Sequence, residues 1–454
     1  MPGATLSPWT MSYFAAACLF LVVGQCAMVA GYGYPFAAVE SPATLALVHV
    51  VAIGWLGLLM TGALLQFVPV LVAAPLRAGR LALPALALLI PGLLLLVGGF
   101  AALGGAEGVS PAMLPSGALL LAMGFGLVII MLATTLLTVR PLPLPARFVA
   151  VGLGALIAAV LVGGAFTLVL SGTVTNYAAI GLLLKGVPLH ATLGLGGWLT
   201  FSAIGVSYRL LPMFMLARDD MWPTSRAVWW AGAAALAIVA ARIVSIAVDS
   251  DGMEGAESVA AFLAVLAAVL YSADVLRLFR ERRRKLVELN VRASYAAFAA
   301  LFASVVMSAL PTTRAAAGEG AAALVYLFVF GWLTGLGLAQ LYKIVPFLTW
   351  LECYGPVLGR VPVPRVQDLV EEKRARLWFF VYYLAVIAAT LSLFAQSPAA
   401  FRVAVLAQLC ATVGLMVELV RARMLSSVVR PCAYPRARRG RISFSRSLDH
   451  RSNR

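Results

Sequence analysis

The sequence predicts an all-α polytopic membrane protein whose twelve transmembrane helices form three four-helix repeats related by a pseudo-threefold axis. Two compositional observations predict the class: of 454 residues, 62% are hydrophobic and only 11% are charged, whereas soluble domains average about 45–50% and about 25%. Because a single soluble core stops growing near about 250–300 residues, the apolar surplus must face lipid. A recurring Gly-Trp-Leu pattern, described below, predicts the repeats.

Apolar runs of about 20 residues, the length needed to cross a bilayer, recur twelve times. They lie at 11–34, 44–72, 81–104, 112–139, 147–171, 187–217, 227–247, 256–279, 293–311, 322–350, 377–396 and 400–422. We expect helices throughout, because lipid offers no partner to unpaired backbone groups and the alternation typical of strands is absent. The first run is too long for a removable signal peptide.

The basic residues predict the orientation of these spans. With both termini inside, thirty of the 34 Lys and Arg residues lie in inner loops, inner flanks or the tail, and the outer side keeps Lys185, Arg242, Arg314 and Arg402. Lys and Arg gather on the cytoplasmic side of membrane proteins, so both termini are expected to be cytoplasmic. The net charge of +16 is therefore a topology signal, and no nucleic-acid partner is expected. The Arg- and Ser-rich tail, 423–454, is expected to be disordered and to rest against anionic lipid headgroups.

Three windows of 23 residues align without gaps and fall in the second, sixth and tenth spans. They are LVHVVAIGWLGLLMTGALLQFVP at 47–69, HATLGLGGWLTFSAIGVSYRLLP at 190–212 and LVYLFVFGWLTGLGLAQLYKIVP at 324–346. Each contains Gly-Trp-Leu, and a proline follows each tryptophan by 14 residues, at Pro69, Pro212 and Pro346. Fourteen residues are about four helical turns, so tryptophan and proline share a face.

The windows recur at every fourth span, which predicts one 1–422 domain built from repeats of about 1–139, 140–279 and 290–422. Small residues also match between the windows, at Gly62, Gly205 and Ala339. Small residues let helices approach closely in lipid, and a proline bends or ends a helix. We therefore expect the three equivalent helices to present similar faces to a shared axis.

Twelve spans in three four-helix repeats, with a histidine near the outer start of the second and sixth, resemble subunit I of the haem–copper oxidase superfamily. That superfamily includes the cytochrome oxidases and the nitric oxide reductases. The chain is also similar in style to the NnrS-like membrane proteins, which are associated with nitric oxide stress, haem and copper. The resemblance implies a bacterial inner-membrane location and an electron-transfer partner in the membrane or periplasm.

The resemblance also implies candidate ligands. His49, six residues before Trp55, occupies the place of the family's low-spin haem ligand, and His190 resembles the copper-site histidine of the sixth helix. The tenth helix of the family carries a His-x-His pair, and one of those two places is Tyr326 here. A b-type haem bound by His49 and Tyr326 and a copper ion bound by His190 are thus implied, although tyrosine is an uncommon haem ligand.

Histidine scarcity separates this chain from the family's enzymes. The oxidase or reductase centre needs six histidines, and this chain has only His49, His190 and, in the tail, His450. The seventh span contains none. We therefore expect neither oxygen nor nitric oxide reduction, and the prediction leans away from an enzyme. Five scattered cysteines without Cys-x-x-Cys spacing also argue against zinc, iron–sulfur and disulfide frameworks.

Alternatives to the redox hypothesis stay open at this point. The same bundle could serve as a solute or metal transporter, or as a cofactor-free structural subunit of a respiratory complex. His49 and His190 differ by two positions in the repeat register, which places them on nearly opposite helix faces, and either could simply reach the outer headgroups. Near the inner ends, Lys343 is expected to extend to headgroups, and Asp274 and Glu418 are expected to pair with arginines.

Overall fold

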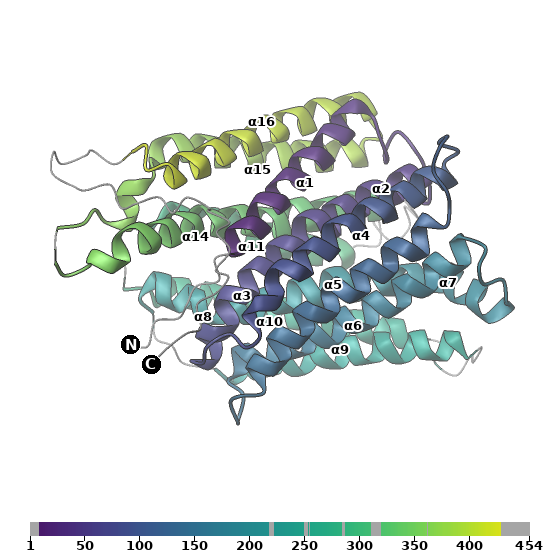
Figure 1. The fold of residues 1–454 in the computed structure, drawn as a ribbon, viewed down its shortest axis with the longest axis horizontal. Coiled ribbons are helices and arrows are strands. Elements are labelled where there is room, and N and C mark those ends of the chain that lie inside the picture. Colours follow the sequence, from purple (N-terminus) through teal and green to yellow (C-terminus); the bar gives the residue numbers. More distant parts are fainter. Residues whose placement is uncertain are drawn as a thin grey trace, which may run out of the picture.

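The computed structural model describes residues 9–217, 222–248, 253, 255–283, 287–309, 319–360 and 362–427. Within these ranges the secondary structure is helical, without β-strands. Twelve helices, long and apolar enough to cross a membrane, run side by side in one bundle (Figure 1). The predicted all-α membrane class and the predicted number of spans are confirmed.

The helical segments follow one another in the order of the predicted spans. Spans one to four comprise α1 (Thr10–Ala30), α2 (Pro42–His49), η1 (Val50–Gly57), α3 (Leu58–Val72), η2 (Gly79–Leu81), α4 (Ala82–Leu103) and α5 (Met113–Leu136). Spans five to eight comprise α6 (Leu144–Leu170), α7 (Tyr177–Ala191), η3 (Thr192–Phe201), α8 (Ser202–Met215), α9 (Pro223–Ala247) and α10 (Ala256–Arg280). Spans nine to twelve comprise α11 (Leu289–Ala309), α13 (Glu319–Tyr326), η4 (Leu327–Thr334), α14 (Gly335–Tyr354), η5 (Gly355–Val357), η6 (Val366–Leu369), α15 (Glu372–Phe394) and α16 (Pro398–Arg423).

The sixth span differs most from its predicted extent, because it begins at Tyr177 and not at 187. The side chain of Asn176 accepts a hydrogen bond from the Ala179 N–H at 2.8 Å and so caps the first turn. Lys185, predicted to lie outside, is part of this helix. The tail from 428 onward, and His450 with it, lies outside the described residues.

The second, sixth and tenth spans are each composite: an α-helix, a π-helical segment and a second α-helix. The π-helical segments are η1, η3 and η4, and each contains one Gly-Trp-Leu motif. Runs of π-helix are rare and occur frequently at functional sites. The sequence pattern did not predict them, and their recurrence at one register distinguishes these three spans from the other nine.

The glycine of each Gly-Trp-Leu motif allows a close helix contact. A Cβ at this glycine would lie within 3 Å of a side chain on the preceding span: Phe20 of α1 for Gly54, Ala155 of α6 for Gly197 and Ala300 of α11 for Gly331. Because lipid supplies no hydrophobic drive between helices, such close packing is a main source of their association. The motif therefore joins each π-helical span to the span before it.

The prolines after the tryptophans end two of the three composite spans. Four residues beyond Pro69 and Pro212, Ala73 and Leu216 adopt left-handed backbone conformations, with φ of 50° and 52°. In both cases the next N–H donates to the proline carbonyl at 3.0 Å. The third composite span differs, since α14 continues beyond Pro346 and ends at Tyr354. The expected helix end is therefore present three residues beyond Pro69 and Pro212, and it is absent near Pro346.

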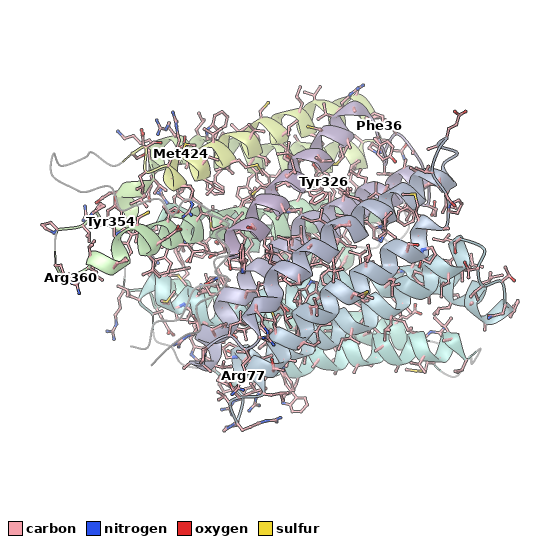
Figure 2. All side chains as sticks on the ribbon, in the orientation of Figure 1. Phe36, Arg77, Tyr326, Tyr354, Arg360 and Met424 are labelled. Atoms are coloured by element: carbon pink, nitrogen blue, oxygen red, sulfur yellow. The ribbon has the colours of Figure 1, made fainter. Side chains whose placement is uncertain are left out.

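In two of the three repeats, the residue eleven positions after the motif tryptophan contacts a residue at the start of the preceding span. Gln66 donates to Thr10 at the start of α1, and the Lys343 ammonium lies 2.6 Å from the Glu288 carboxylate, just before α11. The sequence did not predict this ion pair between Lys343 and Glu288. At the bundle's ends, Figure 2 shows Arg360 toward one side and Phe36 toward the other; the sequence predicts that the Arg360 side is cytoplasmic.

Candidate functional site

Tryptophan side chains connect the π-helical spans to one another. Trp55 is fully buried, and its Nε1 donates to Thr334 Oγ1 at 2.9 Å, from the second span to the tenth. Trp332, also fully buried, donates from Nε1 to Thr200 Oγ1 at 3.3 Å, from the tenth span to the sixth. Both acceptor threonines lie two residues after a motif tryptophan. In both bonds, therefore, a motif tryptophan donates to the residue two positions after the motif tryptophan of another span.

The third bond of this series is missing. By the same rule, Trp198 of the sixth span would donate to position 57 of the second span, and that residue is Gly57, which has no hydroxyl. η1 and η3 are in contact, and Trp198 Nε1 is buried without a hydrogen-bond partner. A buried donor left unpaired costs about 1–3 kcal/mol. The contact between the sixth and second spans is therefore expected to be the least stable of the three.

His49 is the last residue of α2, immediately before η1. Its Nδ1 donates to the Leu45 carbonyl at 2.7 Å, which leaves Nε2 as the nitrogen with a free lone pair. The ring packs against Phe100 of α4, with 5.1 Å between the ring centroids. A ring N–H bonded to a backbone carbonyl is the usual arrangement of a metal-ligating histidine.

His190 lies near the end of α7, two residues before η3. Its ring meets Phe166 of α6 edge-on at 5.6 Å between centroids. The contact depends on Gly163, where a Cβ would lie 2.9 Å from His190 Cε1. His190 Nδ1 is buried without a hydrogen-bond partner, so this side chain presents an unused nitrogen to the protein interior.

The two histidines face different neighbours but occupy one region. His49 packs toward α4 and His190 toward α6, while the π-helical segments that follow them, η1 and η3, touch. The two candidate histidines therefore lie on spans that touch, against different neighbouring helices.

The third candidate, Tyr326, is directed elsewhere. It is the last residue of α13, before η4, and its hydroxyl donates to Gln408 Oε1 of α16. Its ring packs against Phe330 and Phe401, with centroid separations of 4.6 and 5.4 Å. Tyr326 therefore contacts the twelfth span, whereas His49 contacts the third.

A porphyrin ligated by His49 and the tenth span would have to lie between the second and tenth spans. Here these spans are in direct contact through the Trp55–Thr334 hydrogen bond. One turn further along, a Cβ on Gly337 would lie 2.5 Å from Leu59 Cδ2. Because the Tyr326 hydroxyl is bonded to Gln408 of α16, His49 and Tyr326 do not fit opposite faces of one haem, and we derive no chemistry from a haem.

A single metal ion is a different case. Imidazole nitrogen is a ligand type that copper accepts, and His190 Nδ1 and His49 Nε2 are the two nitrogens left for one. No group of three His, Cys, Asp or Glu side chains suited to a metal occurs among the described residues. The described residues therefore offer at most two imidazole nitrogens, on neighbouring spans.

Two buried carboxylates, expected to pair with arginines, behave differently. Glu418 lies 3.2 Å from both Arg374 and Arg421, as expected. Asp274 has no arginine partner among the described residues: its fully buried carboxylate accepts hydrogen bonds from three hydroxyls, those of Tyr208 at 2.8 Å, Thr224 at 2.5 Å and Ser225 at 3.0 Å. The hydroxyls were not expected, and two of them come from the first turn of α9, which begins beside the carboxylate.

A second polar group was missed at the level of Tyr326. Gln25 of α1 is fully buried, and neither of its amide atoms has a hydrogen-bond partner; Gln408 Nε2 and Thr412 Oγ1 of α16 are also unpartnered. The sequence signal was present, since each is a lone polar residue in an apolar helix. The two helices that carry them, α1 and α16, are in contact.

No model of a known protein family matches the chain, and no curated protein matches it. The functional proposal below therefore depends on the residues and contacts of this chain.

Proposed function

We propose that the chain is an integral membrane protein with the three-repeat architecture of haem–copper oxidase subunit I, that it reduces neither oxygen nor nitric oxide, and that it binds copper through His190 and His49. Its place is the bacterial inner membrane, with both termini cytoplasmic. The lipid bilayer surrounds it, and an electron-transfer protein of the membrane or periplasm is its partner.

Repeated contacts support the architecture. A ring of three equivalent helices requires each contact to run in the same rotational sense, and the tryptophan bonds run from the second span to the tenth and from the tenth to the sixth. The recurrence of the π-helical segments and of the glycine contacts at one register agrees with a threefold ring.

The absence of reductase activity follows from the ligand supply and the packing. The family's centre needs six histidines, and three are present in the entire chain. Tyr326, in the place of one tenth-span histidine of the family, has its hydroxyl bonded to Gln408 and its ring packed against Phe330 and Phe401. The chain therefore belongs with proteins that handle a metal or assemble with redox partners, and not with the reductases themselves.

One observation carries the copper proposal: His190 Nδ1 is buried and unpartnered, on a span in contact with the span that carries His49. Burying a polar nitrogen without a partner costs free energy, and a bound cation would remove that cost. Copper suits imidazole ligands, and its affinity exceeds that of the other first-row divalent metals at a given site. His49, whose ring is held by the Leu45 carbonyl, supplies the second nitrogen.

Metal analysis of the purified protein tests this proposal. We expect about one copper per chain, and at least a tenfold weaker Cu(II) affinity in His190→Ala and in His49→Ala, measured by competition with a chromophoric chelator. His450→Ala is the matched control, because it removes the tail histidine, and should retain the parent affinity. Unchanged copper affinity in both His190→Ala and His49→Ala would overturn the copper site.

A second candidate is a cofactor-free structural subunit of a respiratory assembly, which the direct packing of the second and tenth spans favours. An ultraviolet–visible spectrum distinguishes the possibilities. Metal-free, colourless protein that co-purifies with cytochromes would support the structural role. A reducible b-type Soret band would instead show that the second and tenth spans part to admit a haem.

A further inference from the structure

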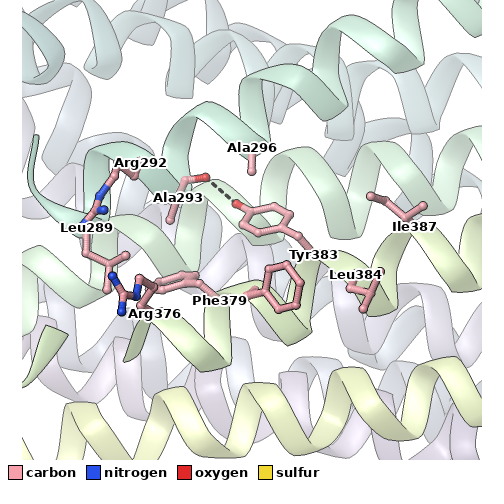
Figure 3. Close-up of a pocket in the computed structure, with 10 residues that line it drawn as sticks. Leu289, Arg292, Ala293, Ala296, Arg376, Phe379, Tyr383, Leu384 and Ile387 are labelled. Carbon is pink, nitrogen blue, oxygen red and sulfur yellow. Dashed lines mark hydrogen bonds between the residues drawn. The ribbon is translucent and has the colours of Figure 1, made fainter. Parts of the chain in front are cut away.

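A groove opens between α11 and α15, away from the tryptophan contacts. It has a volume of about 350 Å³, and Figure 3 shows its lining. The two helices are tied across it by Tyr383, whose hydroxyl donates to the Ala293 carbonyl at 2.7 Å. The remaining walls are apolar, with small side chains on α11 and large ones on α15: Ala293, Ala296, Phe379, Phe380, Leu384 and Ile387.

The apolar part of the groove faces outward. Phe380, Leu384 and Ile387 are 66%, 56% and 53% exposed, although each is a large hydrophobic side chain on a span. From Arg376 to Ile387 the helix rises about 17 Å at 1.5 Å per residue, which is close to half of a hydrocarbon core of about 30 Å. The groove therefore extends over the depth of one lipid leaflet.

Two arginines stand at one end of this groove. Arg292 and Arg376 lie in the first turns of α11 and α15 and approach the same end of the groove in Figure 3. Arg376 has no hydrogen-bond or ion-pair partner within the described residues, and Arg292 meets Glu372 only at 3.5 Å. The sequence predicts this end to be cytoplasmic, the side on which anionic lipids carry the negative surface potential.

We propose that this groove is a binding site for an anionic diacyl glycerophospholipid. The phosphate lies between Arg292 and Arg376, since guanidinium groups bind phosphate oxygens through charge-assisted hydrogen bonds, and an acyl chain follows Phe380, Leu384 and Ile387 into the leaflet. A free phosphate ion would use only the arginines. The apolar length below them, matched to one leaflet, favours a lipid over a soluble anion.

Native mass spectrometry of the delipidated full chain tests the site. The probes are palmitoyl-oleoyl-phosphatidylglycerol and palmitoyl-oleoyl-phosphatidylcholine, which share their acyl chains and differ in net charge. We expect phosphatidylglycerol to bind the parent about tenfold more tightly. The double variant Arg292→Ala/Arg376→Ala should lose that preference, whereas Arg80→Ala, a basic residue in η2 outside the groove, should keep it.

A variant of the apolar wall separates the two halves of the site. Ala296→Phe narrows the groove without changing its charge, so it should weaken the binding of phosphatidylglycerol at least several-fold. Both arginines and Ala296 are partly or fully accessible, so these variants are expected to fold, and their unfolding temperature checks this. Equal binding of the two lipids by the parent, or a preference that survives in the double variant, would overturn the proposal.

Discussion

Two of the three contacts between π-helical spans contain a tryptophan–threonine hydrogen bond, and the third does not. Trp55 and Trp332 each donate to a threonine on the next helix of the series, whereas Trp198 is equally buried and has no acceptor. The three tryptophans share one motif and one register. The difference lies two residues away from the tryptophan, where Thr334 and Thr200 correspond to Gly57.

The Gly-Trp-Leu motif provides the tryptophan donor, whereas another span must provide the acceptor. Gly-Trp-Leu places a bulky side chain at a close helix contact in all three spans. The hydrogen bond, however, depends on a residue from another span that no local pattern specifies. The contact of the sixth span with the second therefore lacks this hydrogen bond, and the sixth span is also the one whose outer part, α7, carries the unpartnered nitrogen of His190.

The largest expected effect comes from removing a tryptophan of a complete link. Trp332 is fully buried, contacts the rings of Tyr271 and Phe298, and donates to Thr200. Trp332→Ala should therefore lower the free energy of unfolding by about 3–5 kcal/mol, measured by denaturant titration in detergent micelles. Trp230→Ala, at a 68% exposed position of α9, is the control. Equal losses in both variants would show that the link does not matter.

Removing only the acceptors should have a smaller effect. Thr334→Val and Thr200→Val keep the side-chain volume but leave a buried Trp Nε1 unpaired, which should cost about 1–2 kcal/mol of unfolding free energy. The cost should be larger at Thr334, because its bond is 2.9 Å long against 3.3 Å at Thr200. Thr134→Val serves as the control, since Thr134 donates only within its own helix. A loss of the same size in that control would contradict the explanation.

A side chain with a hydroxyl at position 57 should provide the missing acceptor for Trp198. A Cβ there would lie 3.3 Å from the Ala52 carbonyl oxygen and 3.7 Å from Phe125 Cζ, so a small side chain fits with slight adjustment. Gly57→Ser should exceed Gly57→Ala in unfolding free energy by about 0.5–1 kcal/mol, because only serine can accept from Trp198. Measuring both variants removes the effect of the added Cβ, and equal stabilities would show that Trp198 does not face this position.

The smallest effect is expected from removing the unpaired N–H itself. Trp198→Phe deletes a donor that has no partner, so its unfolding free energy should stay within about 0.5 kcal/mol of the parent. Trp55→Phe deletes a bonded donor and should cost about 1 kcal/mol more than Trp198→Phe. If Trp198→Phe proves as damaging as Trp55→Phe, the two regions do not differ in the way proposed.

The sequence predicted the spans well because the transfer of a segment into lipid depends on the hydrophobicity of that segment alone. It missed the early start of the sixth span, where the Asn176 cap extends a helix through Lys185. It also missed the π-helical segments, since a π-helical turn and an α-helical turn can contain the same residues. His49 and His190 stay candidates from the resemblance, and the contact between η1 and η3, which brings their two spans together, could not be read from the sequence.

The sequence by itself determined that this chain has twelve segments long and apolar enough to cross a membrane, that three of them share a motif, and that the chain contains only three histidines. Only the tertiary structure decided which tryptophan finds a threonine, which buried carboxylate takes hydroxyls and not arginines, and where two arginines flank an apolar groove. The physical reason is that span formation depends on each segment's own transfer into lipid. Hydrogen bonds, ion pairs and grooves depend on residues far apart in the chain, and packing alone brings those together.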